Sequence, residues 1–276
     1  MRIGKIAARA ALALLLAFTV MPLLFMVTAS LMSSREIMSM PYPWIPSSLH
    51  YENFVKAVRG NDGNFIYLRN ILNSLIAATA VAASTVLLAS SAGYGLAKFR
   101  FKGRMALFML IMATMMIPFE AIMIPLYMVA MKLRIQNSHV GLILPFLVSA
   151  FGVFQMRQYL TTFPVEFLDA ARVDGMGELG IFWRIVFPNC KPVIATLAVI
   201  AFRGQWDNLL WPLLVSQSDE MKTIPQYIST FVQERSTDQG ALMAAALIAS
   251  VPMLLMFMSL TRYFIGGSSV YESRKG

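Results

Sequence analysis

Long apolar runs separated by shorter polar segments dominate the chain. Six runs carry the roughly 20 mostly apolar residues that a membrane-crossing helix needs, at residues 10–32, 71–97, 105–131, 140–156, 192–215 and 241–261. The run at 140–156 is the shortest, and its helix is expected to extend past Gln155. The pattern predicts an all-α membrane protein in which residues 1–276 form a single domain of six transmembrane helices.

Prolines lie inside several of these runs, which bundles tolerate because neighbouring helices satisfy the freed backbone groups. They are Pro22, Pro118, Pro125, Pro145, Pro212 and Pro252. The first run follows Arg2, Lys5 and Arg9 and in this respect imitates a signal peptide. Its uncharged stretch exceeds the roughly 7–15 residues typical of a signal peptide, so we expect a retained first helix.

The composition supports a membrane protein. Hydrophobic residues make up 58% and charged residues 13% of the 276 residues, against about 45–50% and about 25% in soluble domains. The single cysteine, Cys190, excludes an intrachain disulfide, and His50 and His139 lie too far apart to suggest a metal site. The net charge of +9 is attributed to basic loops at a membrane rather than to nucleic-acid binding.

The basic residues predict an orientation. They are more numerous at both termini, around 98–104 and in 157–191 than in the segments 33–70, 132–139 and 216–240. By the positive-inside rule, the first group is cytoplasmic and the second group forms outer loops. Both termini are therefore expected in the cytoplasm. Residues 40–46, with three prolines and two aromatics, suit an extended interfacial segment.

The segment 157–191 is the most informative part of the chain. Acidic residues follow Pro164, as at the start of a helix. Asp174-Gly175 is a turn signal, since glycine accepts a positive φ. A second amphipathic helix is expected to end before Pro188, with one apolar side formed by Phe182, Ile185 and Val186. The prediction is a helix, a sharp turn and a second helix at the cytoplasmic surface.

Small residues precede this turn, at Ala170 and Ala171. They allow another protein's backbone or aromatic side chains to approach closely. Two interpretations stay open from the residues alone. The segment is either an amphipathic anchor at the membrane surface or a docking site.

Ionisable residues within membrane spans are costly and mark candidate functional sites. Glu120, Arg203 and Asp207 are such residues, and Arg203 and Asp207 are four residues apart on one helix face. With a rise of about 1.5 Å per residue, we expect Glu120 and Asp207 at about 22 Å and Arg203 at about 16 Å along their helices. A buried ion-pair cluster, a pathway lining and a proton relay all stay open. Further polar or aromatic candidates for the pathway are Gln205, Trp206, Asn208 and Trp211.

Several motifs resemble the permease subunits of binding-protein-dependent ABC importers. Asp169-Ala170-Ala171, three residues and Gly175, closed by Ile185-Val186-Phe187-Pro188, is similar to their Glu-Ala-Ala loop. Aspartate at 169 and phenylalanine at 187 depart from the family pattern. The resemblance implies a coupling helix that sits in a cleft of a cytoplasmic ATPase and uses Asp169, Ala170, Ala171, Asp174 and Gly175.

Other segments extend the resemblance from about residue 30 to the carboxyl end. The residues are 92–104, Ile117-Pro118 with 124–127, Trp206-Asp207-Asn208 and Trp211-Pro212-Leu213. They are similar to the maltose-type branch, which serves carbohydrates and glycerol phosphates, and to its smaller, six-helix permease. The resemblance implies the type I importer permease fold in the bacterial inner membrane.

The resemblance also implies partners. They are a sister permease, two copies of a cytoplasmic ATP-binding subunit and an extracytoplasmic substrate-binding protein. In the family the outer loop equivalent to 216–240 reaches into that binding protein, here through Lys222, Pro225, Gln226 and Tyr227. No phosphate-binding Gly-x-x-x-x-Gly-Lys-Ser/Thr loop occurs, since Gly4-Lys5 precedes isoleucine. We therefore expect no cofactor and no enzymatic activity in this chain, with ATP and magnesium bound by the partner ATPase.

The expected cargo is a sugar or oligosaccharide. An unpaired Arg203 facing the pathway would instead favour an anionic glycerol phosphate or phosphodiester. An ion-coupled secondary transporter using Glu120 and Asp207 is an alternative from another class. That class is built from inverted repeats with broken helices in matching halves, and no internal repeat is visible.

Overall fold

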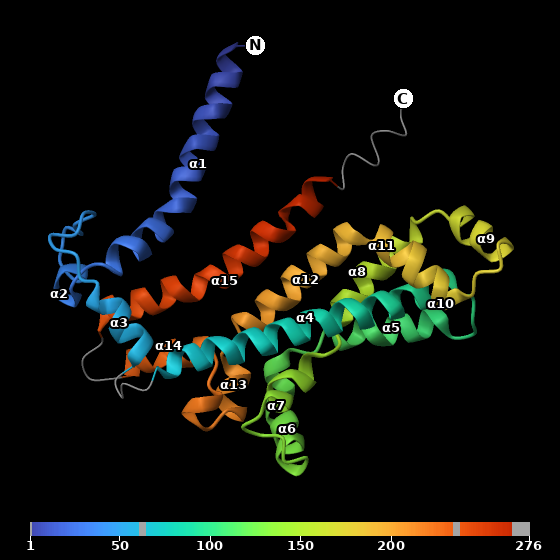
Figure 1. Cartoon of the computed structure of the whole chain (residues 1–276). Helices are drawn as coiled ribbons and strands as arrows, with labels where there is room; N and C mark the ends of the chain where they lie inside the picture. The colour runs from blue at the N-terminus through green and yellow to red at the C-terminus, as the bar shows by residue number, and fades with distance from the viewer. Residues whose placement is uncertain (1, 61–64, 234–237, 267–276) are drawn as a thin grey trace. The chain divides into compact units, whose positions relative to one another are not determined.

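The computed structural model describes residues 2–60, 65–233 and 238–266, and every regular element in these ranges is a helix. The chain divides into two compact units, which are described separately. The first comprises Met1–Ile71 and Ile224–Pro252, and the second Leu72–Thr223 and Met253–Gly276. Figure 1 shows the helices in chain order. The predicted all-α class is confirmed for the described residues.

Three helices are long and apolar enough to cross a membrane by themselves. They are α1 (Arg2–Ala29), α4 (Ile66–Lys98) and α15 (Gln239–Gly266). Three pairs of shorter helices pass the same test when each bent pair is taken as one span, which raises the number to 6 among the described residues. The pairs are Arg104–Thr114 with Phe119–Lys132, His139–Phe146 with Ala150–Thr161, and Glu178–Asn189 with Lys191–Trp206. No residue in the most apolar window of α1 is buried within this chain. Such a surface suits contact with lipid or another apolar protein surface rather than with water.

The run at 105–131 is not one helix. Helix α5 (Arg104–Thr114) ends before Pro118, which caps α6 (Phe119–Lys132), and the two helices meet at 93°. Pro118 has no backbone N–H to continue the helical ladder and disfavours the helical conformation of Ile117. The run predicted as one span with Pro118 inside it is therefore two helices with a sharp bend at this proline.

The next two runs are also broken. Helices α7 (His139–Ile143) and η1 (Leu144–Phe146) join α8 (Ala150–Thr161) at 44°, so the expected extension past Gln155 is confirmed. The run 192–215 divides into α12 (Lys191–Trp206) and α13 (Leu210–Val215). The predicted span 192–215 is thus interrupted at residues 207–209.

In the first unit, buried polar side chains hold short helices against longer ones. The polar segment 33–70 contains α2 (Ser34–Ile37) and α3 (Glu52–Arg59). The buried Asn53 amide of α3 donates hydrogen bonds to the carbonyls of Ser30 and Met32. Residues 40–46 form no helix, as predicted. The Tyr67 hydroxyl donates to the carbonyl of Ala245 at 2.6 Å, which ties α4 to α15 within this unit.

The core of the second unit joins α4, α8 and α12 to the segment between α8 and α12. Its buried residues include Val86, Ala89, Val153, Met156, Leu160, Leu168, Ile181, Val186 and Leu197. Figure 1 shows α4, α5, α8 and α10 in one group with α9 (Glu166–Val173) beyond them. The predicted cytoplasmic segment is therefore part of this core and not a detached loop.

A close approach between α4 and α8 sets this packing. A Cβ atom added at Gly93 would lie 2.6 Å from Cβ of Met156 and 3.0 Å from the backbone nitrogen of Arg157. Nothing lies within 4 Å of a Cβ added at Gly95, two residues along the same helix. Glycine at 93 therefore has a packing role that glycine at 95 lacks.

We expect Gly93→Ala to destabilise the protein by about 1–3 kcal/mol, since overpacking at a helix contact costs this much. Gly95→Ala is the matched control and should be neutral or stabilising, because alanine is the better helix former. Thermal denaturation of the purified protein in detergent measures both. Equal midpoints for the two variants would contradict the close contact.

Candidate functional site

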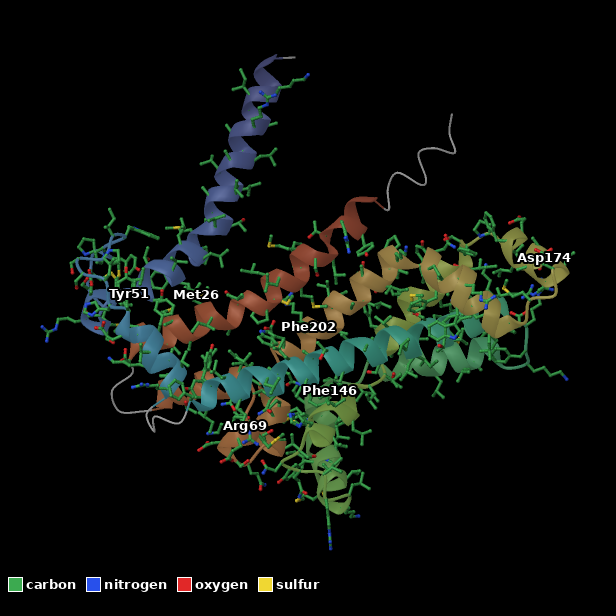
Figure 2. All side chains as sticks on the ribbon, in the orientation of Figure 1. Met26, Tyr51, Arg69, Phe146, Asp174 and Phe202 are labelled. Atoms are coloured by element: carbon green, nitrogen blue, oxygen red, sulfur yellow. The ribbon has the colours of Figure 1, made fainter. Side chains whose placement is uncertain are left out.

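Helix α9 presents two different faces. Leu168 and Ala171 are buried in the core of the second unit, while Asp169 and Ala170 are exposed. Figure 2 shows Asp174 at the end of this region, directly after α9. The apolar face therefore fixes α9 to its own unit and leaves the motif residues Asp169 and Ala170 accessible. Ala171, expected to be a contact residue, is instead part of the packing.

The turn after α9 has the predicted conformation. Asp174 caps the helix, and Gly175 has φ +79°, the left-handed region that glycine adopts without steric cost. The amides of Gly175 and Met176 donate to the carbonyls of Arg172 and Ala171. A Cβ atom at Gly175 would meet nothing within 4 Å. The turn is thus closed by backbone hydrogen bonds and open to an approaching partner.

The second helix does not end before Pro188, contrary to prediction. Helix α10 (Glu178–Ile181) passes into a π-helical turn, η2 (Phe182–Val186), and then into α11 (Phe187–Asn189). The amide of Phe187 donates to the carbonyl of Phe182, five residues back. A widened turn of this kind accommodates the proline that follows it. The apolar side is confirmed, because Phe182 and Val186 are buried and Ile185 packs on the same cluster.

A polar network fastens the helix and the turn. The Arg172 guanidinium donates at 2.8 Å to Asp169 and at 2.8 Å to Glu178. Glu178 also accepts a hydrogen bond of 2.9 Å from the Tyr94 hydroxyl of α4. The hydrogen bond from Arg172 holds the pKa of Glu178 below its usual range, and the two carboxylates raise the pKa of Arg172. Glu178 therefore stays ionised near neutral pH and connects three elements.

Sequence reasoning did not single out Glu178 or Tyr94. The spacing of Asp169 and Arg172, three residues apart on a helix, was a readable signal for an ion pair. Glu178 lies beyond the turn, and Tyr94 lies 84 residues from it in the chain. Only the fold brings these side chains together.

Exposed apolar side chains flank the turn. Val173 is 88% exposed and Leu179 is 79% exposed. Apolar side chains held this far into solvent, beside a turn that the core fixes in place, are suited to contact with another protein.

Of the interpretations left open for the three ionisable residues, a buried ion-pair cluster is not what the structure shows. Arg203 of α12 and Asp207, which caps this helix, form an ion pair of 3.3 Å, but their side chains are 71% and 60% exposed. Glu120 is exposed in the first turn of α6, after the sharp bend at Pro118. Within the described ranges no ion pair joins it to the other two. The expected depth of Glu120 assumed a straight helix and does not hold.

Three of the other pathway candidates are buried. Gln205 donates to the carbonyl of Leu142 at 3.2 Å, and the Trp211 indole donates to the carbonyl of Gly141 at 2.9 Å. Trp206 stacks on Phe202 with ring centroids 5.6 Å apart. Gln205 and Trp211 thus join α12 and α13 to α7, and Trp206 packs within α12. Asn208 is half-buried, and its carbonyl oxygen accepts the backbone N–H of Trp211.

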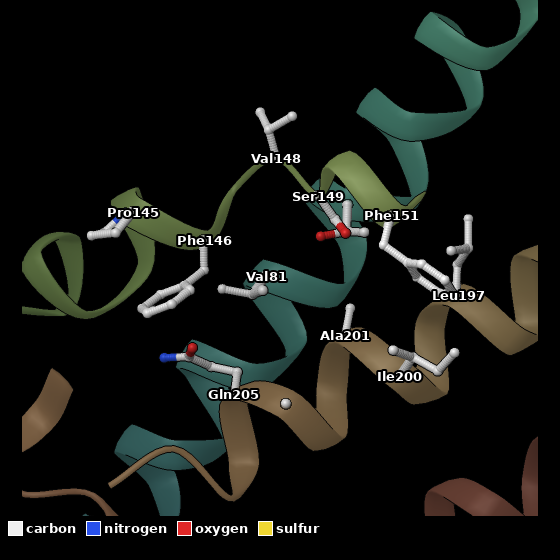
Figure 3. A pocket seen from close by; sticks show the side chains of 12 residues that line it. Val81, Pro145, Phe146, Val148, Ser149, Phe151, Leu197, Ile200, Ala201 and Gln205 are labelled. Atoms are coloured by element: carbon white, nitrogen blue, oxygen red, sulfur yellow. The ribbon is translucent and has the colours of Figure 1, made fainter. Parts of the chain in front are cut away.

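A cavity of about 280 Å³ lies where α4, α12 and the break between η1 and α8 meet. Figure 3 shows Gln205 and Ala201 of α12 opposite Phe146 and Ser149. The lining is largely apolar, with polar groups from Thr85, Ser149 and Gln205. The break in the fourth predicted span thus borders a small hollow rather than continuous packing.

The residues expected to contact a binding protein are largely enclosed. Gln226 and Tyr227, in α14 (Ile224–Gln233), are buried, and the Tyr227 hydroxyl donates to the carbonyl of Ala57. Lys222 pairs with Asp219, and Pro225 is half-buried. Gln226 and Tyr227 are therefore packing residues of the first unit, because their amphipathic helix turns this side inward.

Comparison with known proteins identifies the family. Residues 85–267 match the family described as binding-protein-dependent transport system inner membrane component. The chain is 36% identical to an arabinooligosaccharide transport system permease protein of Halalkalibacterium halodurans, over 91% of this chain and 90% of that protein. It is 40% identical to a lactose transport system permease protein of Rhizobium radiobacter, over 71% of each chain. It is 33% identical to an sn-glycerol-3-phosphate transport system permease protein of Rhizobium meliloti, over 90% of each chain.

A solved structure has the same fold. It is the crystal structure of a bacterial ABC transporter involved in the import of the acidic polysaccharide alginate, with a TM-score of 0.82 and 19% identity. The match covers 95% of this chain and 97% of that chain. At this identity the likeness concerns the fold alone.

We expect Arg172→Met to loosen the segment 166–178, because it removes both hydrogen bonds that tie Asp169 to Glu178. Hydrogen exchange near neutral pH should become about two- to fivefold faster there, as fits a partly exposed charge network. Arg184→Met is the matched control, since Arg184 is an exposed arginine of the same segment with no ion pair among the described residues.

The same comparison has an expected pH dependence. A carboxyl group whose pKa is lowered on folding stabilises the fold above its unfolded pKa, and this contribution is lost as the pH falls through the folded pKa. The difference between wild type and Arg172→Met should therefore shrink in acid as Glu178 becomes protonated. An unchanged difference at low pH would show that the network does not depend on ionised Glu178.

Proposed function

Because the chain belongs to the inner membrane components of binding-protein-dependent transport systems, we propose that it is the smaller of two different permease subunits in an ATP-driven importer. The family places it in the inner membrane as a multi-pass transport subunit and not an enzyme. In our proposal it works with a sister permease, two copies of a cytoplasmic ATP-binding subunit and an extracytoplasmic binding protein. Membership of this family leaves the ion-coupled alternative without support.

The proposed topology has six membrane spans with both termini in the cytoplasm. Three long helices and three bent pairs supply spans of sufficient length among the described residues. The excess of basic residues at the termini, at 98–104 and in 157–191 supports this orientation. The break between η1 and α8 lines a cavity, a place where irregular backbone is tolerated in membranes.

The proposed coupling site is the exposed tip formed by α9 and its turn. The observation that carries this proposal is the division of α9 into a wholly buried anchor, Leu168, and an exposed side with Asp169, Ala170 and Val173. A partner that pushes on such a tip moves the core to which it is fixed. Asp174 and Gly175 belong to the same accessible turn.

ATP and magnesium are bound by the partner ATPase in this proposal, since the chain has no phosphate-binding loop motif. ATP binding there draws the ATPase pair together and displaces the segment 157–191. The bundle then turns from an inward-facing to an outward-facing state.

The proposed cargo is a carbohydrate delivered by the binding protein. Relatives named for arabinooligosaccharide and lactose transport, at 36% and 40% identity, support this choice. A relative named for sn-glycerol-3-phosphate transport keeps an anionic cargo as a second candidate. The exposed Arg203 is the one pathway candidate whose charge suits such a cargo, although Asp207 pairs with it.

The proposed pathway residues are the exposed Glu120, Arg203 and Asp207 together with Asn208. Their exposure leaves them accessible to solvent, lipid or cargo in the single chain. For the binding protein, the accessible candidates are the half-buried Lys222 and Pro225.

Gly175→Trp tests the coupling proposal in the complete reconstituted complex. The substitution places an indole on the exposed turn and should reduce binding-protein-stimulated ATP hydrolysis at least tenfold, while the subunits still copurify. The matched control is Gly103→Trp, because Gly103 also has a positive φ, +82°, and open space around its Cβ position, but lies outside this segment. Tenfold corresponds to about 1.4 kcal/mol of lost coupling.

Stimulation that survives Gly175→Trp while uptake continues would reject the coupling site. The segment 157–191 would then be a surface anchor only.

Arg203→Gln tests the cargo. For a neutral oligosaccharide, uptake by proteoliposomes should stay within about twofold of wild type, because an exposed pair on one helix contributes little. Arg100→Gln, an exposed arginine between α4 and α5, is the control. If the wild type imports glycerol phosphate and Arg203→Gln abolishes this import, the anionic cargo is favoured instead.

A further inference from the structure

Two side chains of α4 bracket the coupling segment. The Tyr94 hydroxyl donates to Glu178 at 2.9 Å, and the Lys98 ammonium donates to the carbonyl of Phe163 at 2.6 Å. Phe163 lies just before α9, and Glu178 lies just after the turn that follows it. Tyr94 and Lys98 are four residues apart and so share one face of α4. One turn of α4 therefore holds both ends of the segment 164–177.

An aromatic ring lies beside each of the two hydrogen bonds. The Tyr94 ring is 5% exposed and lies 5.5 Å from the ring of Phe182. The Lys98 ammonium lies 5.9 Å from the centre of the Phe163 ring. Tyr94 is buried and Lys98 is half-buried, and a hydrogen bond shielded from water is stronger than one at an open surface.

The rest of α4 is an uninterrupted helix, which can transmit a displacement from one of its ends to the other. No proline interrupts it, whereas α6 and α15 contain Pro125 and Pro252. Within the second unit its part from 72 to 98 is about 40 Å long at the usual rise per residue. The turn of α4 that contains Gly93 packs directly against α8.

We propose that Tyr94 and Lys98 are positioning residues that fasten the coupling segment to α4, so that a push on α9 moves α4 with it. This inference rests on the proposed coupling role of the segment 157–191. It assigns the transfer of motion to two named hydrogen bonds rather than to the general packing of α9. The Arg172 network supports it, since Arg172 locks Glu178 to α9 itself.

The test compares Tyr94→Phe, Lys98→Met and the double variant in the reconstituted complex with its binding protein. Each substitution keeps the apolar part of the side chain and removes one donor. Tyr159→Phe is the matched control, since its hydroxyl also donates to a carbonyl of this region, that of Asn189, but not to either end of 164–177. The readouts are stimulated ATP hydrolysis, import and the amount of cargo imported per ATP hydrolysed.

We expect the import per ATP to fall about two- to tenfold in each single variant and further in the double variant. This range corresponds to the net contribution of one intramolecular hydrogen bond. ATP hydrolysis should fall much less, because the ATPase still meets the tip. Import and hydrolysis that fall in proportion, or import per ATP equal to that of Tyr159→Phe, would overturn the inference. If Gly175→Trp still abolishes stimulation in that case, the coupling site stands and only this route of transfer fails.

A second measurement applies even if the double variant assembles poorly. Spin labels at Val173→Cys and Leu88→Cys report the distance between the exposed tip and α4, and the only native cysteine of the chain, Cys190, is buried. The distance distribution should stay narrow and unchanged between the resting complex and the complex trapped with ATP. A clear change of this distance in otherwise wild-type protein would show that α9 moves separately from α4 and would contradict the proposal.

Discussion

The absence of water in hydrocarbon is the constraint on which the rest of the structure depends. Each backbone N–H and C=O of a spanning segment must find a partner within the protein, and among the described residues every regular element is a helix. Breaks in the spans fall near Pro118, between η1 and α8, and after Trp206. Next to the second of these breaks, the Trp211 indole donates to the carbonyl of Gly141. Gln205 and Trp211, which the sequence suggested as pathway residues, instead hold helices together through hydrogen bonds to backbone carbonyls.

The same packing rule explains how a segment at the membrane surface can transmit force. Helix α9 is only eight residues long and would not be stable alone. Leu168 anchors it in the core, and Arg172 joins Asp169 to Glu178 across the turn. The tip beyond this anchor stays exposed, with Val173 and Leu179 directed away from the core. An accessible tip on a rigid base is what a transport subunit driven by a separate ATPase requires.

The apolar runs and local signals predicted the helical class, the turn at Gly175 and the apolar side of Phe182 and Val186. These features depend on neighbours in the chain. The bends did not follow from the apolar runs, since proline is compatible with both a kinked span and a broken one. At Pro118 the helix is broken, and its two parts meet at 93°. The links from Tyr94 to Glu178 and from Tyr227 to Ala57 span 84 and 170 residues, and a single sequence holds no signal for them. The spacing of Arg203 and Asp207 agrees with their ion pair, but the exposure of both side chains depends on the fold.

The central claim is that the tip of α9 touches the ATPase. A photo-reactive amino acid at position 173 of the intact complex in native membranes tests it directly, because Val173 is 88% exposed beside the turn. Met116, an apolar residue that is 84% exposed between α5 and α6, is the matched control position. Illumination should link position 173, but not position 116, to the ATP-binding subunit. A complex that assembles and transports but gives no such adduct from position 173 would contradict the account.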